Sequence, residues 1–128
     1  MRDYVFVYGT LRRGGANHGW LADARCLGEH WTEPAYRMLD VGPYPGVVKG
    51  GRTPIRGEVY RVTPAQMKRL DELEDCPRSY TRERIETPWA SAWMYLYRPG
   101  GQRLPEIDSG DWLACSPLAG RGPDRSRA

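Results

Sequence analysis

The stretch VFVYGTLRRGGANH, residues 5 to 18, is the most informative part of this sequence. It begins with Val, Phe, Val and Tyr, residue types that favour a buried β-strand. At Gly9 the chain becomes polar, basic and rich in glycine. A glycine-rich turn after a strand is typical of phosphate-binding loops, but the Lys and Ser or Thr that complete such a loop are missing. We therefore expect a strand that ends at a specialised turn, without a bound nucleotide.

The length of 128 residues predicts a single domain with its own hydrophobic core. We assign residues 1–116 to this domain and residues 117–128 to a disordered tail rich in Arg, Gly and Pro. No apolar run approaches the roughly 20 residues of a membrane helix, and the N-terminus lacks a signal-peptide pattern. Three cysteines without a C-x-x-C pair are typical of a reducing compartment. A cytoplasmic protein that does not bind membranes is expected.

The charge and the ligand-type residues argue against nucleic acid and metal. The net charge is +3, and the tail contributes +2 of it through three Arg and one Asp, which leaves +1 for the domain. A basic surface for nucleic acid is therefore not expected. His18 and His30 do not have metal-ligand spacing. We expect no metal and no cofactor, and the sequence leaves the oligomeric state open.

Short runs rich in Val, Ile, Tyr and Trp, separated by Gly and Pro, predict an α+β protein with five main strands. These are Asp3–Tyr8, Arg25–Trp31, Ile55–Val62, Tyr80–Glu86 and Ala92–Arg98. A short sixth strand is expected at residues 46–48, inside a loop rich in Gly and Pro. The last main strand has apolar or aromatic residues on both faces. This pattern predicts a small mixed β-barrel, closed or nearly closed, with flanking helices.

Two helices are expected beside the strands. Thr63 is a suitable N-cap, Pro64 suits the first helical position, and Gln66 completes a capping box with Thr63. This helix is expected to continue until Pro77 stops it. A second, shorter helix is expected from Asn17 to about Ala24, with Asn17 as its cap.

Glu74 occupies an unexpected position on the first of these helices. At about 100° per residue it lies in the middle of the apolar stripe. The other members of that stripe are Met67, Leu70 and Leu73. A carboxylate on a core-facing stripe is costly unless it is paired, hydrogen-bonded or neutral. Helix geometry leaves two interpretations open: an ion pair with Arg82 or Arg84, or a general base at the edge of a water-poor cavity.

Two segments together resemble a known family. VYGTL near the N-terminus, followed by LDELED and YTRERI, is similar to the gamma-glutamylcyclotransferase-like family, and closest to its gamma-glutamylamine cyclotransferase (AIG2-like) branch. GPYPGVV and SGDW support the match, which spans residues 4 to about 115. The resemblance implies a small mixed β-barrel with flanking helices.

The resemblance also implies a reaction and its residues. A γ-glutamyl amide closes on itself, giving 5-oxoproline and a free amine. Because the substrate's own α-amine is the nucleophile, no Ser-His-Asp or Cys-His set is needed. The match gives Glu74 the role of catalytic acid and base, and makes Tyr8, Gly9, Thr10 and Leu11 the substrate-binding loop. Relatives often have Gly after the catalytic Glu, whereas this chain has Asp75.

Several roles remain hypotheses. The backbone amides of Gly9, Thr10 and Leu11 are expected to hold the developing oxyanion. Tyr80 and Trp112 are weaker candidates for a pocket wall or lid, since aromatic residues at such positions more often belong to the core. Arg12 and Arg13 are expected to be solvated loop charges, with contact to a substrate carboxylate as the alternative for either. The alternatives to a cyclotransferase are a non-catalytic small-molecule binding module of the same fold, and a hydrolase or acyltransferase that acts on γ-glutamyl substrates.

Overall fold

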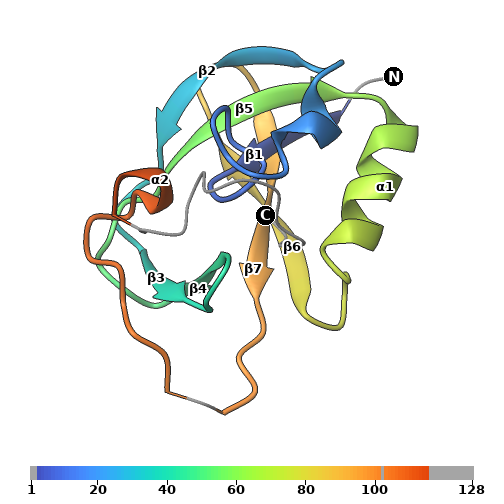
Figure 1. Ribbon diagram of the computed structural model, residues 1–128. Helices are drawn as coiled ribbons and strands as arrows, with labels where there is room; N and C mark the ends of the chain where they lie inside the picture. The colour runs from blue at the N-terminus through green and yellow to red at the C-terminus, as the bar shows by residue number, and fades with distance from the viewer. Residues whose placement is uncertain (1–2, 102, 116–128) are drawn as a thin grey trace.

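The computed structural model describes residues 3–101 and 103–115. The tail predicted from residue 117 onward lies outside the described residues. The strands are β1 (Asp3–Val7), β2 (Arg25–Trp31), β3 (Tyr36–Asp40), β4 (Pro45–Lys49), β5 (Arg56–Val62), β6 (Tyr80–Glu86) and β7 (Ser91–Tyr97). The helices are the 3-10 helix η1 (His18–Leu21), α1 (Pro64–Leu73) and the short α2 (Trp112–Cys115). Figure 1 shows their arrangement.

Five strands form one mixed sheet in the order β2-β5-β1-β7-β6, and β3 and β4 form a separate two-stranded ribbon. The pairing of β1 with β7 is parallel, and the other pairings are antiparallel. The predicted α+β class with a mixed sheet is confirmed. A fully closed barrel is not observed, because β2 and β6 are the two edges of the sheet among the described residues. Trp89, in the turn between β6 and β7, packs against Gly28 of β2, so the curved sheet brings its edges near each other.

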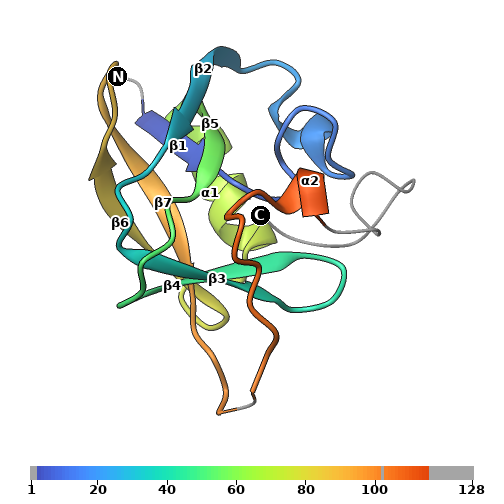
Figure 2. The ribbon, with the colours of Figure 1, turned by 90° about the vertical axis from the view of Figure 1, so that its left-hand side faces the viewer.

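The central strand β1 is buried on both faces, which explains its unbroken apolar run. Val5 and Val7 belong to a core cluster with α1, whereas Phe6 and Tyr8 belong to a second cluster with the β3–β4 ribbon. Figures 1 and 2 show α1 against the sheet, and the β3–β4 ribbon in a different place, below β1 and β5 and beside β7. The end of β1 therefore lies where both clusters meet.

Helix α1 begins as the sequence predicts. The Thr63 hydroxyl accepts a hydrogen bond from the Gln66 amide at 3.1 Å, and the Gln66 side chain accepts one from the Thr63 amide at 2.8 Å. Both bonds of the capping box are therefore present. The helix buries Met67 and Leu70 against the sheet and ends at Leu73, with Glu74 as its C-cap. The predicted apolar stripe is confirmed, and it delivers Glu74 to the core.

Two expectations for the remaining elements are wrong. The second helix is only a 3-10 turn, and Asn17 makes no side-chain capping bond to it. The side-chain amide of Asn17 instead donates to the Thr10 hydroxyl at 3.1 Å. This contact with the preceding loop competes with local capping of the helix. Strand β3 was not expected, and the short strand at 46–48 extends to five residues because β3 pairs along its whole length. No helix within the described residues is long and apolar enough to span a membrane.

Candidate active site

The loop after β1 is a tight turn from Gly9 to Arg12, closed by a 3.1 Å hydrogen bond from the Arg12 amide to the Gly9 carbonyl. Thr10, a central residue of this turn, is held by Asn17, whose backbone amide donates to the Thr10 carbonyl at 2.9 Å. Gly15 approaches the turn so closely that a Cβ there would overlap the Thr10 carbonyl oxygen. The turn is therefore fixed by contacts from the following residues.

The carbonyl and amide groups of this turn differ in their hydrogen bonding. The Leu11 carbonyl accepts a 3.1 Å hydrogen bond from Nδ1 of His18, which must carry the proton. None of the hydrogen bonds among the described residues uses the amides of Gly9 or Leu11. The turn therefore holds these two amides outside the sheet ladder.

The expectation of two solvated arginines is wrong for Arg12, whose side chain is 4% exposed. Its guanidinium donates to Asp111 at 2.8 Å and lies 3.9 Å from Glu58. Arg13 is exposed as expected, but its backbone amide donates to the Glu58 carboxylate at 2.8 Å. Sequence spacing could not show this, because the two carboxylates are 45 or more residues away along the chain. The bonds to Glu58 and Asp111 together anchor the turn to β5 and to the segment before α2.

Asp111 belongs to the SGDW motif and receives a second guanidinium. Arg56 donates to its other oxygen at 2.7 Å. Burial opposes ionisation of Asp111, but the hydrogen bonds from Arg12 and Arg56 outweigh it and lower the pKa of this carboxyl. The structure thus gives a physical reason why SGDW accompanies YGTL: Asp111 holds Arg12, and Arg12 holds the turn. The co-occurrence of the two motifs was the signal that could have identified this pair.

Glu74 is completely buried at the end of α1. Its backbone amide donates to the Leu70 carbonyl at 2.9 Å, so its position is set by the last helical turn. Arg82, one of the two arginines considered as its partner, forms an ion pair with Asp71 at 3.0 Å. Arg84, the other, lies over the Trp93 ring at 4.6 Å. Both arginines are therefore engaged with other groups on β7 and α1.

Three buried tyrosines lie close enough to Glu74 for its charge to affect their pKa values. Burial raises the pKa of Tyr8, Tyr80 and Tyr95, and the charge of Glu74 raises each further. Their hydroxyls donate to the Tyr95 carbonyl, the Pro45 carbonyl and the Asp71 carboxylate, at 2.8, 2.8 and 2.7 Å. These phenols therefore stay neutral and are oriented by other acceptors. They provide an aromatic, water-poor surrounding for Glu74.

The structure brings the first residue of the predicted loop, Tyr8, together with Glu74. Tyr80 lies near both of them, whereas Trp112 lies fully buried in the core cluster with Phe6. Tyr95 was not singled out from the sequence, since it appeared only as one residue of an aromatic strand. The arrangement pairs a buried carboxylate with a rigid turn of backbone amides, and it contains no group of three or more metal-ligating side chains within the described residues.

Comparison with known proteins identifies the family of this arrangement. The family "Gamma-glutamyl cyclotransferase, AIG2-like" matches residues 5–114. The chain belongs to this family. A Vibrio cholerae protein is 46% identical over 112 residues, covering 88% of this chain and 96% of that protein. The gamma-glutamylcyclotransferase family protein YtfP of Escherichia coli is 42% identical over 109 residues, covering 85% and 95%.

Solved structures share the fold. An uncharacterised protein from Pyrococcus horikoshii aligns with a TM-score of 0.74 at 31% identity, covering 88% of this chain and 91% of that one. A mouse AIG2-like protein aligns with a TM-score of 0.73 at 26% identity, covering 91% of each chain. The family membership inferred from YGTL and LDELED is thereby confirmed, and the names of the family and of the relatives support a gamma-glutamylcyclotransferase-like activity.

Proposed function

We propose that this protein converts a γ-glutamyl amide into 5-oxoproline and a free amine, with Glu74 as general acid and base. The observation that carries the proposal is the complete burial of Glu74 beside Tyr8, at the start of the YGTL turn. A carboxylate removed from water gains by accepting a proton, because burial disfavours its charged form. This is the property that a base for the substrate amine requires.

The covalent change is an exchange of two bonds at one carbon. The α-amine nitrogen of the substrate, as free base, bonds to the γ-carbonyl carbon, and the bond from that carbon to the departing nitrogen breaks. Glu74 takes the proton that the attacking nitrogen loses and delivers it to the departing nitrogen. A positioned acid or base of this kind contributes on the order of 10²–10⁴ in rate.

The turn at Gly9 has two tasks in this proposal. The amides of Gly9, Thr10 and Leu11 stabilise the negative charge that develops on the γ-carbonyl oxygen. The anchored turn also holds the substrate folded, with its amine against its own carbonyl, and the effective molarity of such a geometry can be very large. The ion pair of Arg12 with Asp111 keeps these amides in place before the substrate arrives. No metal or cofactor takes part in these steps.

The experiment is an incubation with γ-glutamyl alkylamides and γ-glutamyl peptides, with the products separated and identified by mass spectrometry. Formation of 5-oxoproline and free amine in equal amounts supports the proposal. Free glutamate would instead show a hydrolase, in which water replaces the internal amine. Binding without any product would show a binding module of the same fold. The Glu74→Gln variant serves as the control for contaminating activity.

A further inference from the structure

A groove with a volume of about 680 Å³ lies between the β3–β4 ribbon, the start of β6, the end of β7 and the segment that follows β7. On the ribbon, Arg37, Leu39 and Val48 line the groove, whereas Met38 and Val47 belong to the core cluster. Because successive side chains of a strand point to opposite faces, the groove lies on the face of the ribbon that is turned away from the core. Its volume is within the range of about 300–1,000 Å³ that is typical of ligand pockets.

The outer wall of the groove is held in place by backbone hydrogen bonds. Figure 1 shows the segment after β7 running away from the sheet and returning past the ribbon. On its return, the Pro105 carbonyl accepts a hydrogen bond from the Asp40 amide at 2.8 Å. The Ile107 amide donates to the Met38 carbonyl, also at 2.8 Å. Residues 103–104, which line the groove directly before these bonds, are therefore held beside β3.

The floor of the groove is apolar. Leu39 and Leu96 are 6% and 7% exposed, and Val48 and Leu104 are half-buried in the same groove. Tyr97 covers the end of the floor and leaves only hydrogen at the neighbouring ribbon glycine, because a Cβ there would overlap the ring. The floor therefore suits a hydrocarbon chain, since removal of apolar surface from water is favourable.

Three cations and no carboxylate line the groove among the described residues, namely Arg37, Lys49 and Arg103. Arg37 pairs with Glu106 at 3.2 Å. Lys49 pairs with Glu83 at 3.0 Å. The four side chains of these two pairs are between 44% and 59% exposed. Exposed ion pairs contribute little to stability, so both cations can exchange their partner for a bound anion.

Arg103 takes part in none of the ion pairs found within residues 3–101 and 103–115. It is exposed at the rim of the groove. Even when Glu83 and Glu106 are counted, the cations exceed the carboxylates by three to two, and only the cations line the groove. A cleft lined by charges of one sign concentrates ligands of the opposite sign.

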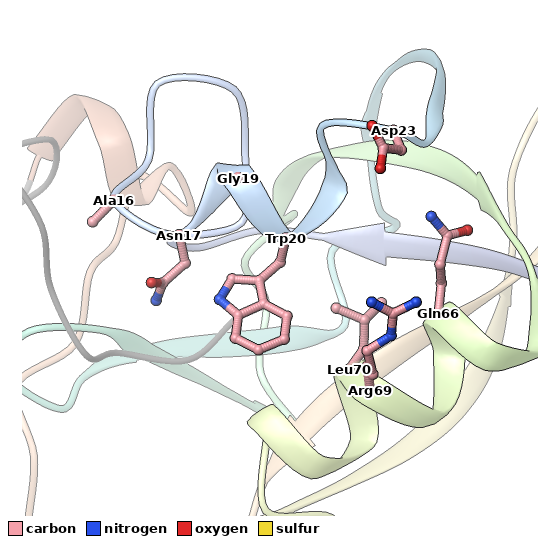
Figure 3. Close-up of a pocket in the computed structure, with 8 residues that line it drawn as sticks. All are labelled: Ala16, Asn17, Gly19, Trp20, Asp23, Gln66, Arg69 and Leu70. Carbon is pink, nitrogen blue, oxygen red and sulfur yellow. The ribbon is translucent and has the colours of Figure 1, made fainter.

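The pocket between η1 and α1 differs in this respect. Figure 3 shows the Asp23 carboxylate and the Arg69 guanidinium among the side chains of that pocket, which has a volume of about 390 Å³. One carboxylate and one cation cancel, so this pocket does not select a ligand by the sign of its charge. Selection of an anion is therefore a property of the groove beside the ribbon.

We propose that this groove binds a free aliphatic carboxylate, a molecule with a hydrocarbon chain and one acidic end. The chain lies on the apolar floor, and the carboxylate meets Arg103, whose planar guanidinium can donate to both of its oxygens. Neither Glu74 nor the residues 9–12 of the turn line the groove, so binding there is independent of the reaction proposed above.

The first test titrates the full chain with decanoate, hexanoate and decylammonium, each below its micelle-forming concentration, with calorimetry at low ionic strength. A fully buried methylene is worth about fourfold in affinity, so four half-buried methylenes predict roughly fifteenfold tighter binding of decanoate than of hexanoate. Decylammonium has the same chain and the opposite charge. It should bind about tenfold more weakly than decanoate, because attraction to the exposed cations becomes repulsion.

Three results of this titration would overturn the proposal. Absence of decanoate binding would exclude the site itself. Equal affinities of decanoate and decylammonium would show that the cations do not select the ligand. Equal affinities of decanoate and hexanoate would show that the floor does not hold a chain.

Substitutions then locate the charge. Arg103→Gln should weaken decanoate binding by about three- to fivefold, because one exposed charge pair is lost. Lys68→Gln is the matched control: Lys68 is exposed on α1 and does not line the groove, so the affinity should keep its wild-type value. Both side chains are exposed, and unchanged melting temperatures would confirm that both variants fold. Equal effects of the two substitutions would overturn the role of Arg103.

A spin-labelled probe locates the chain without any substitution. A doxyl-labelled decanoate should broaden the amide NMR signals of residues 37–39, 48–49, 96–97 and 103–104, which line the groove or adjoin its lining, and leave those of α1 sharp. Broadening confined to η1 and α1 would show that the chain binds in the other pocket and would overturn the assignment. These measurements do not involve 5-oxoproline formation, so their outcome is separate from that of the proposed function.

Discussion

At the residue scale, the carboxylate of Glu74 carries the proposed chemistry and the backbone of the Gly9–Arg12 turn carries the proposed charge stabilisation. The side-chain role of Glu74 and the backbone role of the turn require different kinds of substitution as tests. A side chain can be replaced by an isostere, whereas a backbone amide can only be displaced by changing its surroundings. The predictions for the two sites are therefore designed differently.

Glu74→Gln should abolish turnover, with a loss on the order of 10²–10⁴ in kcat, because the amide cannot accept or deliver the proton. The substitution conserves shape, so the melting temperature and the affinity for a γ-glutamyl amide should change little. The measurements are kcat by 5-oxoproline formation, thermal unfolding and calorimetric binding. A variant with near wild-type kcat would contradict the role of Glu74. Failure to fold would favour a purely structural carboxylate.

Gly9→Ala and Thr10→Ala form a matched pair for the turn. Gly9 is buried and is not among the glycines with positive φ in the described residues, so the expected effect is a Cβ that blocks close approach of the substrate. Displacement of one oxyanion donor costs about 10²–10³ in kcat, which sets the expected loss for Gly9→Ala.

Thr10→Ala keeps every amide and removes only a hydroxyl that accepts from Asn17 at 3.1 Å. We expect a stability loss of about 1 kcal/mol and a much smaller loss of kcat than for Gly9→Ala. Thermal unfolding of both variants separates folding from catalysis. If Thr10→Ala were the slower enzyme, the hydroxyl would have a catalytic role and the backbone explanation would be wrong.

At the element scale, the end of α1 explains why a Gly, which the family resemblance implies after Glu74, would suit this position. Asp75 has a φ of 54°, in the left-handed region. The Cys76 amide donates to the Asp71 carbonyl at 2.9 Å and the Asp75 amide donates to the Glu72 carbonyl at 3.1 Å. These two bonds form a Schellman motif, whose C′ position usually holds glycine. The departure from the family pattern therefore concerns backbone conformation rather than the chemistry of Glu74.

Asp75→Gly should consequently leave kcat unchanged and alter the free energy of unfolding by less than about 1 kcal/mol. Relief of the left-handed strain is worth about 1–2 kcal/mol, and the lost hydrogen bond from the Ser79 hydroxyl, 2.9 Å long, offsets much of it. Glu72→Gly, at an exposed position inside the helix, is the contrast and should destabilise by about 1 kcal/mol. Chemical denaturation and steady-state kinetics measure both. A fall in kcat for Asp75→Gly would show that its charge matters to Glu74.

At the scale of the whole molecule, the ion-pair network joins parts of the chain that are far apart in sequence. Arg12 follows β1, Arg56 begins β5, and Asp111 precedes α2. The network has a consequence for stability against acid, because the lowered pKa of Asp111 couples its ionisation to folding.

A carboxyl whose pKa is lower in the folded than in the unfolded state stabilises the fold above its unfolded value, about 3.9 for Asp. This contribution disappears as the pH falls through the lower, folded value. The difference in unfolding free energy between wild type and Asp111→Asn should therefore be constant at neutral pH and shrink below about pH 4. Denaturation series from pH 7 to pH 2 provide the comparison. A difference that stays constant down to pH 2 would contradict the coupling.

The features determined by the sequence alone are those with local causes. The capping box of Thr63 and Gln66 is completed within one turn of helix, so its residues identify it. Strands β2 and β6 have the predicted bounds because their residue types and flanking turns mark them. Glu74 was found because helical periodicity is also local, and a carboxylate among apolar positions stands out.

Only the tertiary structure decided the features that depend on distant partners. Arg12 in a glycine-rich loop has the sequence pattern of a solvated charge, and it is buried because Asp111, 99 residues away, lies within hydrogen-bond distance. Asn17 was expected to cap a helix and instead holds Thr10. Strand β3 exists because β4 pairs with it. Each outcome is a competition between a local preference and a long-range contact, and the long-range partner is set by the fold rather than by neighbouring residues.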